Sequence, residues 1–178
     1  MIGKENRRKN FKSKKEESPY DQSIVEISRV TRVMAGGKRL SFRACVVIGD
    51  RKGHVGMGLA KAKDVPMAVQ KAVRKAEKEM IGVYLIDGTI PHEVRVKESS
   101  ARIMLKPAPA GTGIISGGAV RIVLELAGIE NIVSKIFGSN NKVNNIRATL
   151  KGLSMMKKRQ LFGGKKKKEE AVVAIDKK

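Results

Sequence analysis

The sequence of 178 residues is poor in aromatic residues and cysteine, which argues against a binding mode based on aromatic stacking and against an internal disulfide. Aromatic residues make up 3% of the chain and tryptophan is absent, so bases stacked on successive rings are not its main way of holding a nucleic acid. The single cysteine, Cys45, excludes an internal disulfide and indicates a reducing, cytoplasmic setting. No run approaches the roughly 18 apolar residues of a membrane span, and residues 1–15 lack the apolar stretch of a signal peptide. We therefore expect neither a membrane span nor secretion.

Acidic residues are also few, because 38 basic residues face 17 acidic ones and give a formal net charge of +21. Residues 1–15 hold seven basic side chains against one acidic, and residues 151–178 hold ten against three. Blocks such as 165–168 repel themselves and lack apolar periodicity, so we predict disordered basic arms at 1–21 and 157–178. Such arms can serve solubility alone. A basic body between two basic arms, however, is the charge distribution of a chain that neutralises many phosphates.

The first half of the chain predicts an antiparallel sheet of three strands covered by a helix. β-branched and polar residues alternate over 24–33, and further strands are expected over 40–48 and 54–60, with glycine-containing turns at 35–39 and 49–53. Asp64 is placed to cap a helix, and Pro66 lies in its first turn, where a missing N–H is tolerated. Apolar residues then recur at spacings of three and four as far as Gly82. We predict a domain over residues 22–84.

The second half predicts another small domain over residues 85–156, after a hinge at 83–91. Strands are expected over 92–98, 101–107 and 131–137, and helices over 119–127 and 142–153. Strands and helices that alternate in this way indicate an α/β sandwich whose helices pack on one face of the sheet. The fold class expected for the whole chain is therefore α+β, with two small domains.

A cluster of basic side chains belongs to the three-strand unit. An exposed hairpin end that presents Lys38 and Arg39 could reach across phosphates, although the same turn could be a bare hairpin. The sheet of the first domain is thus our candidate RNA-facing surface. Its predicted RNA-binding residues are Arg29, Arg32, Lys38, Arg39, Arg43, Arg51, Lys52, Lys61 and Lys63.

A glycine-rich loop precedes the helix at 119–127, a position where backbone N–H groups can receive a phosphate. Its spacing fits neither nucleotide-binding fingerprint, because Ser116 stands where the Rossmann pattern needs glycine and Gly118 is followed by Ala119 rather than lysine. Docking of an RNA phosphate, packing against a neighbouring protein and a purely structural turn all remain open. The loop residues concerned are Gly111, Thr112, Gly113, Gly117 and Gly118.

No catalytic or metal-binding constellation stands out. His54 and His92 are far apart in sequence and lack the paired spacing of a metal site. Acidic residues are scattered and mostly lie beside Lys or Arg, so a paired-carboxylate site has no support. We predict that the protein is not an enzyme and uses no metal, cofactor or small-molecule substrate.

Several long motifs closely resemble the bacterial small-subunit ribosomal protein five family. The resemblance covers about residues 22–156 and leaves out the lysine-rich ends. In the first half the matching segments are GGKRLSF (36–42), VIGD (47–50), GHVGMG (53–58) and KAKDVP (61–66). In the second half they are GTIPH (88–92), PA (107–108), GTGIISGGAVR (111–121), GSN (138–140) and residues 144–153.

The resemblance implies a two-domain, ribosome-bound constituent of the small subunit. Its first half would be similar to a double-stranded-RNA-binding fold, and its second half to an α/β fold shared with a family of small-molecule kinases. The implied partners are small-subunit rRNA and small-subunit ribosomal proteins four and eight. The implied place is near the channel through which mRNA enters, with an influence on assembly and decoding accuracy.

Two functional details follow from the resemblance alone. The loop Ala35, Gly36, Gly37, Lys38, Arg39 resembles one whose alteration gives spectinomycin resistance. Arg121 resembles, by position, a residue at the contact with protein four where accuracy mutants arise.

Two other readings compete with this one. A free-standing module for double-stranded RNA would leave residues 83–153 without a role. A small-molecule kinase would need nucleotide binding and a catalytic acidic residue that the chain lacks.

Overall fold

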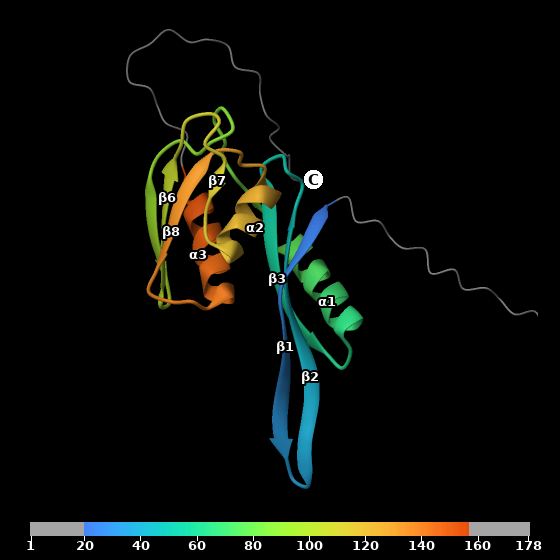
Figure 1. Ribbon diagram of the computed structural model, residues 1–178. Coiled ribbons are helices and arrows are strands. Elements are labelled where there is room, and N and C mark those ends of the chain that lie inside the picture. Colours follow the sequence, from blue (N-terminus) through green and yellow to red (C-terminus); the bar gives the residue numbers. More distant parts are fainter. Residues whose placement is uncertain (1–19, 157–178) are drawn as a thin grey trace, which may run out of the picture.

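The computed structural model describes residues 20–156, which form two mixed domains that contain two sheets and three helices (Figure 1). The expected α+β class is confirmed. The predicted arms lie almost wholly outside the described residues, except that the first strand begins at Asp21, the last residue of the predicted arm. The predicted limits of the two domains stay a prediction.

The first sheet has four antiparallel strands in the order β1-β2-β3-β4. Their bounds are Asp21–Met34, Gly37–Gly49, His54–Ala62 and Ile81–Gly82. Pairing of β1 with β2 continues to Met34 and Gly37, so only Ala35 and Gly36 form the turn. The predicted turn at 35–39 was therefore too long, because the positive φ angles of Gly36 (+83°) and Gly37 (+157°) permit a tighter one.

Helix α1 (Val65–Lys78) packs closely on one face of this sheet. A Cβ atom added to Gly58 would lie 1.8 Å from the carbonyl oxygen of Ala72, so only glycine permits this approach. The face of the helix that contacts the sheet consists of small residues, because Ala68, Ala72 and Ala76 are fully buried. Asp64 is the N-cap residue as predicted, but its side chain makes no capping hydrogen bond.

The end of this helix differs from the prediction, which extended it to Gly82. The helix ends at Lys78, and Ile81 and Gly82 form strand β4 beside β3. A strand of two residues has no periodicity that a sequence can reveal.

The second sheet has the strand order β5-β6-β8-β7, and its helices are α2 (Gly118–Ala127) and α3 (Lys142–Ser154). The strands are Val94–Glu98, Ala101–Pro107, Ile132–Phe137 and, for β7, Ile114–Ile115. β7 pairs parallel to β8 across α2, which gives a β-α-β arrangement. We did not predict β7, because its two residues lie within the glycine-rich loop.

The main hydrophobic core is shared by both domains. The face of the first sheet opposite α1 contributes Cys45, Val47 and Met57, and these belong to one cluster with Leu124 of α2 and Ile103 of β6. Figure 1 shows α2 between the two sheets. Each domain therefore completes the core of the other.

The connection between the domains, which we expected to be a hinge, is held in place by packing and hydrogen bonds. The side chain of Ile90 is buried, and the N–H of Val83 donates to the carbonyl of Gly53 at 2.7 Å. The turn between β2 and β3 also bonds to the end of α2: Arg51 N donates to Leu126 O and Gly53 N to Ala127 O, both at 3.0 Å. These bonds satisfy helix carbonyls that have no partner within the helix. We call this contact the domain joint.

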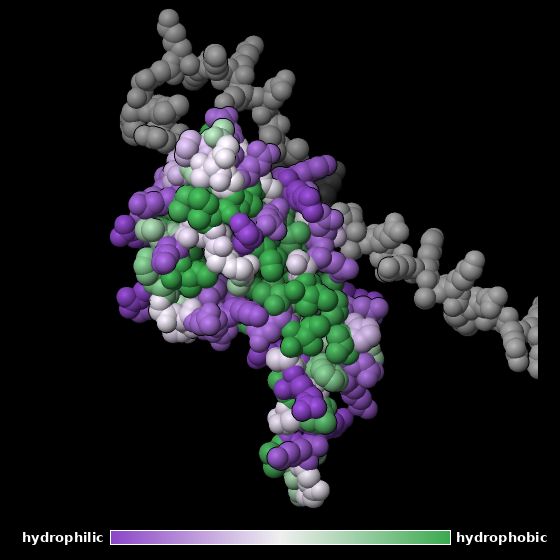
Figure 2. Space-filling view, viewed as in Figure 1, coloured by the Kyte–Doolittle hydropathy of each residue, from purple (hydrophilic) through white to green (hydrophobic). Residues whose placement is uncertain are grey.

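A strip of the first sheet remains uncovered by the described residues. Ile24 and Ile27 on the edge strand β1 share the face that carries Val46 and Ala44, yet they are 47% and 44% exposed. Figure 2 shows hydrophobic residues gathered over this part of the molecule and hydrophilic residues around its margins.

Candidate nucleic-acid interface

A groove with cationic walls lies where the β1–β2 hairpin extends past α1. It has a volume of about 430 Å³, and we call it the basic groove. None of the residues that line it is acidic, and hydroxyl groups of Thr31 and Ser41 lie among its cations. The lining residues are Val30, Thr31, Arg32, Arg39, Ser41, Lys61, Ala62, Lys63 and Lys71.

Strand register sets cations opposite one another in this part of the sheet. Arg32 pairs with Arg39 across β1 and β2, and Arg43 pairs with Lys61 across β2 and β3. Like charges directly opposite in a sheet are destabilising, and no salt bridge involves these four residues within the described part of the chain. A bound anion would relieve that repulsion.

The basic groove collects only some of the nine predicted RNA-binding residues. Arg32, Arg39, Lys61 and Lys63 line it. Arg43 lies beside Lys61 and donates from Nε to the Ser28 hydroxyl at 3.1 Å.

Two further predicted cations, Arg29 and Lys38, lie on strands but outside the groove. Side chains alternate along a strand, so the side chains of Arg29 and Lys38 lie on the opposite face of the sheet from those of Arg32 and Arg39. Lys38 and Arg39 therefore point to opposite faces of the hairpin, and their joint contact with RNA stays a prediction.

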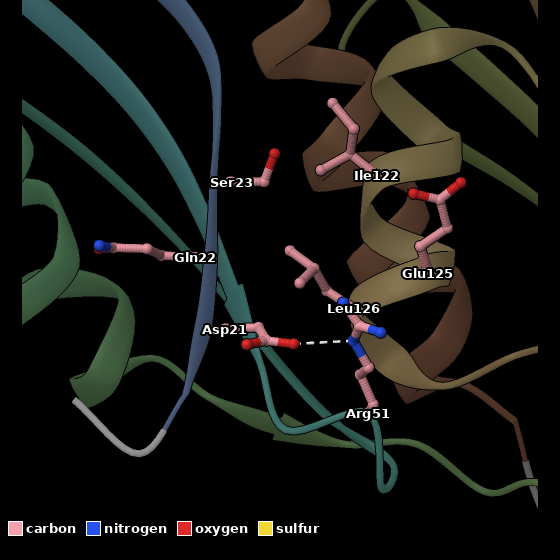
Figure 3. Close-up of a pocket in the computed structure, with 7 residues that line it drawn as sticks. All are labelled: Asp21, Gln22, Ser23, Arg51, Ile122, Glu125 and Leu126. Carbon is pink, nitrogen blue, oxygen red and sulfur yellow. Dashed lines mark ion pairs between the residues drawn. The ribbon is translucent and has the colours of Figure 1, made fainter. Parts of the chain in front are cut away.

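The remaining predicted pair, Arg51 and Lys52, lies at the domain joint. Arg51 Nε is 2.7 Å from a carboxylate oxygen of Asp21. Figure 3 shows this ion pair among the residues that line a cleft between β1 and α2, which include Glu125 and Ile122. The volume of this cleft is about 290 Å³. A cleft with two carboxylates suits an anion poorly.

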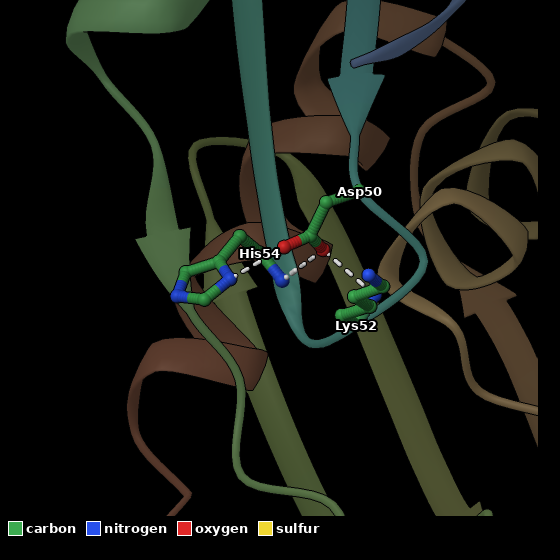
Figure 4. Close-up of polar contacts among 3 residues, drawn as sticks. All are labelled: Asp50, Lys52 and His54. Carbon is green, nitrogen blue, oxygen red and sulfur yellow. Dashed lines mark hydrogen bonds and ion pairs between the residues drawn. The ribbon is translucent and has the colours of Figure 1, made fainter. Parts of the chain in front are cut away.

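Asp50 organises the turn that contains these residues (Figure 4). Its Oδ1 accepts from the N–H of Lys52 at 2.7 Å and of His54 at 2.9 Å, and its Oδ2 lies 2.7 Å from His54 Nδ1. Burial raises the pKa of Asp50, but the backbone bonds from His54 and Lys52 and the His54 ring outweigh it and leave the pKa below its ordinary value. His54 is thus part of a structural turn.

Asn131 anchors the glycine-rich loop from beneath. Its side-chain oxygen accepts from the N–H groups of Gly111 and Gly113 at 3.0 and 3.1 Å, and its own side chain is buried. Two of the N–H groups that could have received a phosphate are therefore already bonded. Close packing explains the glycine at position 117, because a Cβ atom there would lie 2.7 Å from Ile136 Cδ1. Thr112 bonds within the loop to Pro109, and Gly118 faces open space.

Arg121 ties α2 to β7. Its Nη2 donates to the carbonyl of Ile114 at 2.7 Å, and its Nε lies 3.8 Å from Glu125. The side chain is about half exposed, so it both supports the loop and reaches the surface.

Sequence reasoning missed Lys71 as a member of the basic groove. It lies on α1, outside the strands whose cations we predicted to bind RNA. The available signal was its place among the cations of the polar side of the helix, but the direction of the helix across the sheet decides whether Lys71 and Lys63 converge.

The described residues contain no group of three or more His, Cys, Asp or Glu side chains that could hold a metal ion. Over the same residues, no helix is both long and apolar enough to cross a membrane. The fold and the basic groove together define a class: a basic α+β protein of two domains whose groove cations form no salt bridge within residues 20–156.

The comparisons with known proteins narrow this class. The family description "Ribosomal protein S5, N-terminal domain" matches residues 20–84, and "Ribosomal protein S5, C-terminal domain" matches residues 96–166. The chain is 47% identical over 157 residues to small ribosomal subunit protein uS5 of Acaryochloris marina (strain MBIC 11017), which covers 88% of this chain and 89% of the relative. The chain belongs to the ribosomal protein S5 family.

Proposed function

We propose that this protein is a constituent of the small ribosomal subunit that binds rRNA through the basic groove. One observation carries the proposal: the cations of the basic groove face one another without a carboxylate among the lining residues. Phosphates between them would remove the repulsion and release condensed counterions, which favours binding at moderate salt. Because phosphate contacts position a protein without reading sequence, the rigid sheet would fix the path of the RNA.

The experiment compares two double variants of the full chain. Arg39→Ala with Lys61→Ala removes two cations of the basic groove, and Lys75→Ala with Lys78→Ala removes two exposed cations from the last turn of α1. Affinity for small-subunit rRNA is measured over a series of salt concentrations. Each lost phosphate contact flattens the slope of log affinity against log salt by about 0.9, so the groove variant should lose up to about 1.8.

The control variant should keep nearly the parent slope. If both variants flatten the slope equally, cations contribute to RNA binding wherever they lie on the surface, and the basic groove is not the specific site.

We further propose that the protein supports subunit assembly and influences decoding accuracy near the channel through which mRNA enters. The surface formed by Arg121 and the glycine-rich loop is the candidate contact with protein four, and contact with protein eight belongs to the same proposal. Support comes from the exposed half of the Arg121 side chain and from the Asn131 bonds that occupy loop N–H groups. Packing against a protein is favoured over phosphate binding at this loop.

The competing functions fit less well. A nucleotide-binding loop would need free backbone donors where Gly111 and Gly113 already bond to Asn131. A free-standing module would expose the other face of the first sheet, whose buried residues belong to a core that both sheets share, although the face under α1 has a core of its own.

A further inference from the structure

The second sheet has one face that α2 and α3 leave uncovered. Side chains alternate along its strands, so Val96, Ile103 and Leu105 are buried toward the helices while their neighbours point outward. Figure 1 shows both helices on the side of β6 and β8 that faces the first sheet. We call the opposite side the outer face. Its basic and aromatic side chains are Arg95, Lys97, Arg102, Lys106, Lys135 and Phe137.

Strand register orders these side chains in rows across the sheet. Lys97 lies beside Arg102, and Arg102 beside Phe137. In the next row Met104 lies between Arg95 and Lys135. Cations and apolar side chains are thus interleaved on one flat surface.

Little on the outer face neutralises this charge. Glu93 bonds to Arg95 at 2.8 Å and lies 3.4 Å from Lys106, and the bond from Arg95 keeps the pKa of Glu93 below its ordinary value. Within residues 20–156, Lys97, Arg102 and Lys135 form no ion pair. The outer face therefore suits an anionic partner.

The apolar side chains indicate which anionic partner. Phe137 is 46% exposed at the end of a strand, beside Arg102. Against a duplex backbone this ring would meet phosphates and water, whereas an unpaired base can stack on it. The basic groove differs, because none of the residues that line it is aromatic.

We infer that the outer face is a second nucleic-acid site, which binds single-stranded RNA with a base stacked on Phe137 and phosphates held by Lys97 and Arg102. This inference extends the proposed function, on which it rests, by adding a site for unpaired RNA to the one that receives phosphates in the basic groove. The protein then joins two RNA segments on opposite ends of one rigid body.

The test uses the full chain with two fluorescent probes, a single-stranded RNA of about 12 nucleotides without self-complementarity and an RNA duplex of about 16 base pairs. Phe137→Ala should weaken binding of the single strand about tenfold, the effect expected for loss of one stacked base, without changing the salt slope. Arg102→Gln should flatten that slope by about 0.7. Neither change should alter duplex binding, and unchanged melting temperatures exclude a folding defect.

The groove variant Arg39→Ala with Lys61→Ala is the matched control. It should weaken duplex binding and keep most of the affinity for the single strand. The inference is wrong if Phe137→Ala and Arg102→Gln leave single-strand affinity unchanged, or if they weaken both probes equally. A further outcome also contradicts the inference: polyglutamate binds the parent protein, loses that binding in Arg102→Gln, and displaces neither RNA probe. The outer face would then receive an acidic protein. Failure of the proposed function looks different, because the groove variant would then leave duplex binding intact.

Discussion

Asp50 acts at the scale of a single residue, because one carboxylate closes the turn that forms the domain joint. Its oxygens receive two backbone N–H groups and contact the His54 ring. Those contacts favour the ionised form and place the pKa of Asp50 below the ordinary 3.8. The turn is therefore most stable when Asp50 is charged.

The substitution Asp50→Asn tests this account through pH. The lowered pKa means that the charged carboxylate stabilises the fold at pH above 3.8, and this contribution is lost as the pH falls through the folded pKa. Asparagine can still accept the backbone bonds but loses the charge. At pH 7 the variant should lose about 1 kcal/mol of unfolding free energy, a low value because solvent screens the site.

The difference between the two proteins should shrink as the pH falls below about 3.8, where the parent also loses its charge. Denaturant unfolding at several pH values measures it. A difference that stays constant over the whole range would assign the loss to packing and not to ionisation.

Individual residues also show how far the sequence could lead. Alternation along the strands located cations on the sheet, but whether Arg39 faces Arg32 depends on the register set by the two-residue turn. A longer turn would have removed Lys38 and Arg39 from β2 altogether. The role of Asn131 had no local signal, since its partners Gly111 and Gly113 lie about twenty residues earlier.

At the scale of elements, regular helices and long strands were predictable because their apolar periodicity extends over many residues. Helix α3, expected over 142–153, spans Lys142–Ser154. Strands β4 and β7 were not predictable, because two residues show no alternation and pairing with a distant strand alone defines them. The basic groove shares this difficulty, since Lys71 reaches it from a helix.

Helix α2 and strand β7 offer a prediction at this scale. Arg121→Leu removes the bond to the Ile114 carbonyl and the contact with Glu125 while it keeps an apolar stem. If this surface meets a neighbouring protein only in one subunit state, a change of about 1 kcal/mol there shifts the balance roughly fivefold. We expect misreading to rise severalfold in a reporter assay, with assembly largely intact.

Glu125→Gln is the control for the Arg121 variant, because it weakens only the 3.8 Å ion pair and leaves the carbonyl bond. Ribosomes that contain the Glu125→Gln protein should misread codons nearly as rarely as those that contain the parent. Normal accuracy in ribosomes that are fully occupied by the Arg121→Leu protein would contradict the proposal.

At the scale of the whole molecule, the domain joint fixes the distance between the basic groove and the outer face. The two surfaces belong to different sheets, and a shared core lies between them. A protein that orders RNA by its shape needs such rigidity, because a loose joint would let the two RNA segments move independently. The sequence predicted two domains but not this shared core, because the inward faces of both sheets become complementary only once the chain is folded.

Gly128 makes the rigidity of the joint testable. It ends α2 with a φ of +82°, and a Cβ atom there would lie 2.1 Å from the carbonyl oxygen of Arg51. Gly128→Ala should therefore lose more than about 3 kcal/mol, since backbone strain of about 1–2 kcal/mol is joined by displacement of the turn. Gly36→Ala is the control: its φ is +83°, but nothing lies within 4 Å, so only the strain remains.

The shared core predicts that the parent unfolds in one calorimetric transition whose van't Hoff and calorimetric enthalpies agree. Gly128→Ala should separate the two sheets and spoil that agreement, whereas Gly36→Ala should preserve it at a lower melting temperature. Gly49→Ala attacks the joint from the first domain, because its Cβ would lie 2.2 Å from Leu126 O, and it should behave as Gly128→Ala does. If both joint variants still unfold in a single transition and lose no more stability than Gly36→Ala, the domains do not depend on the joint, and the fixed spacing of the two surfaces loses its physical basis.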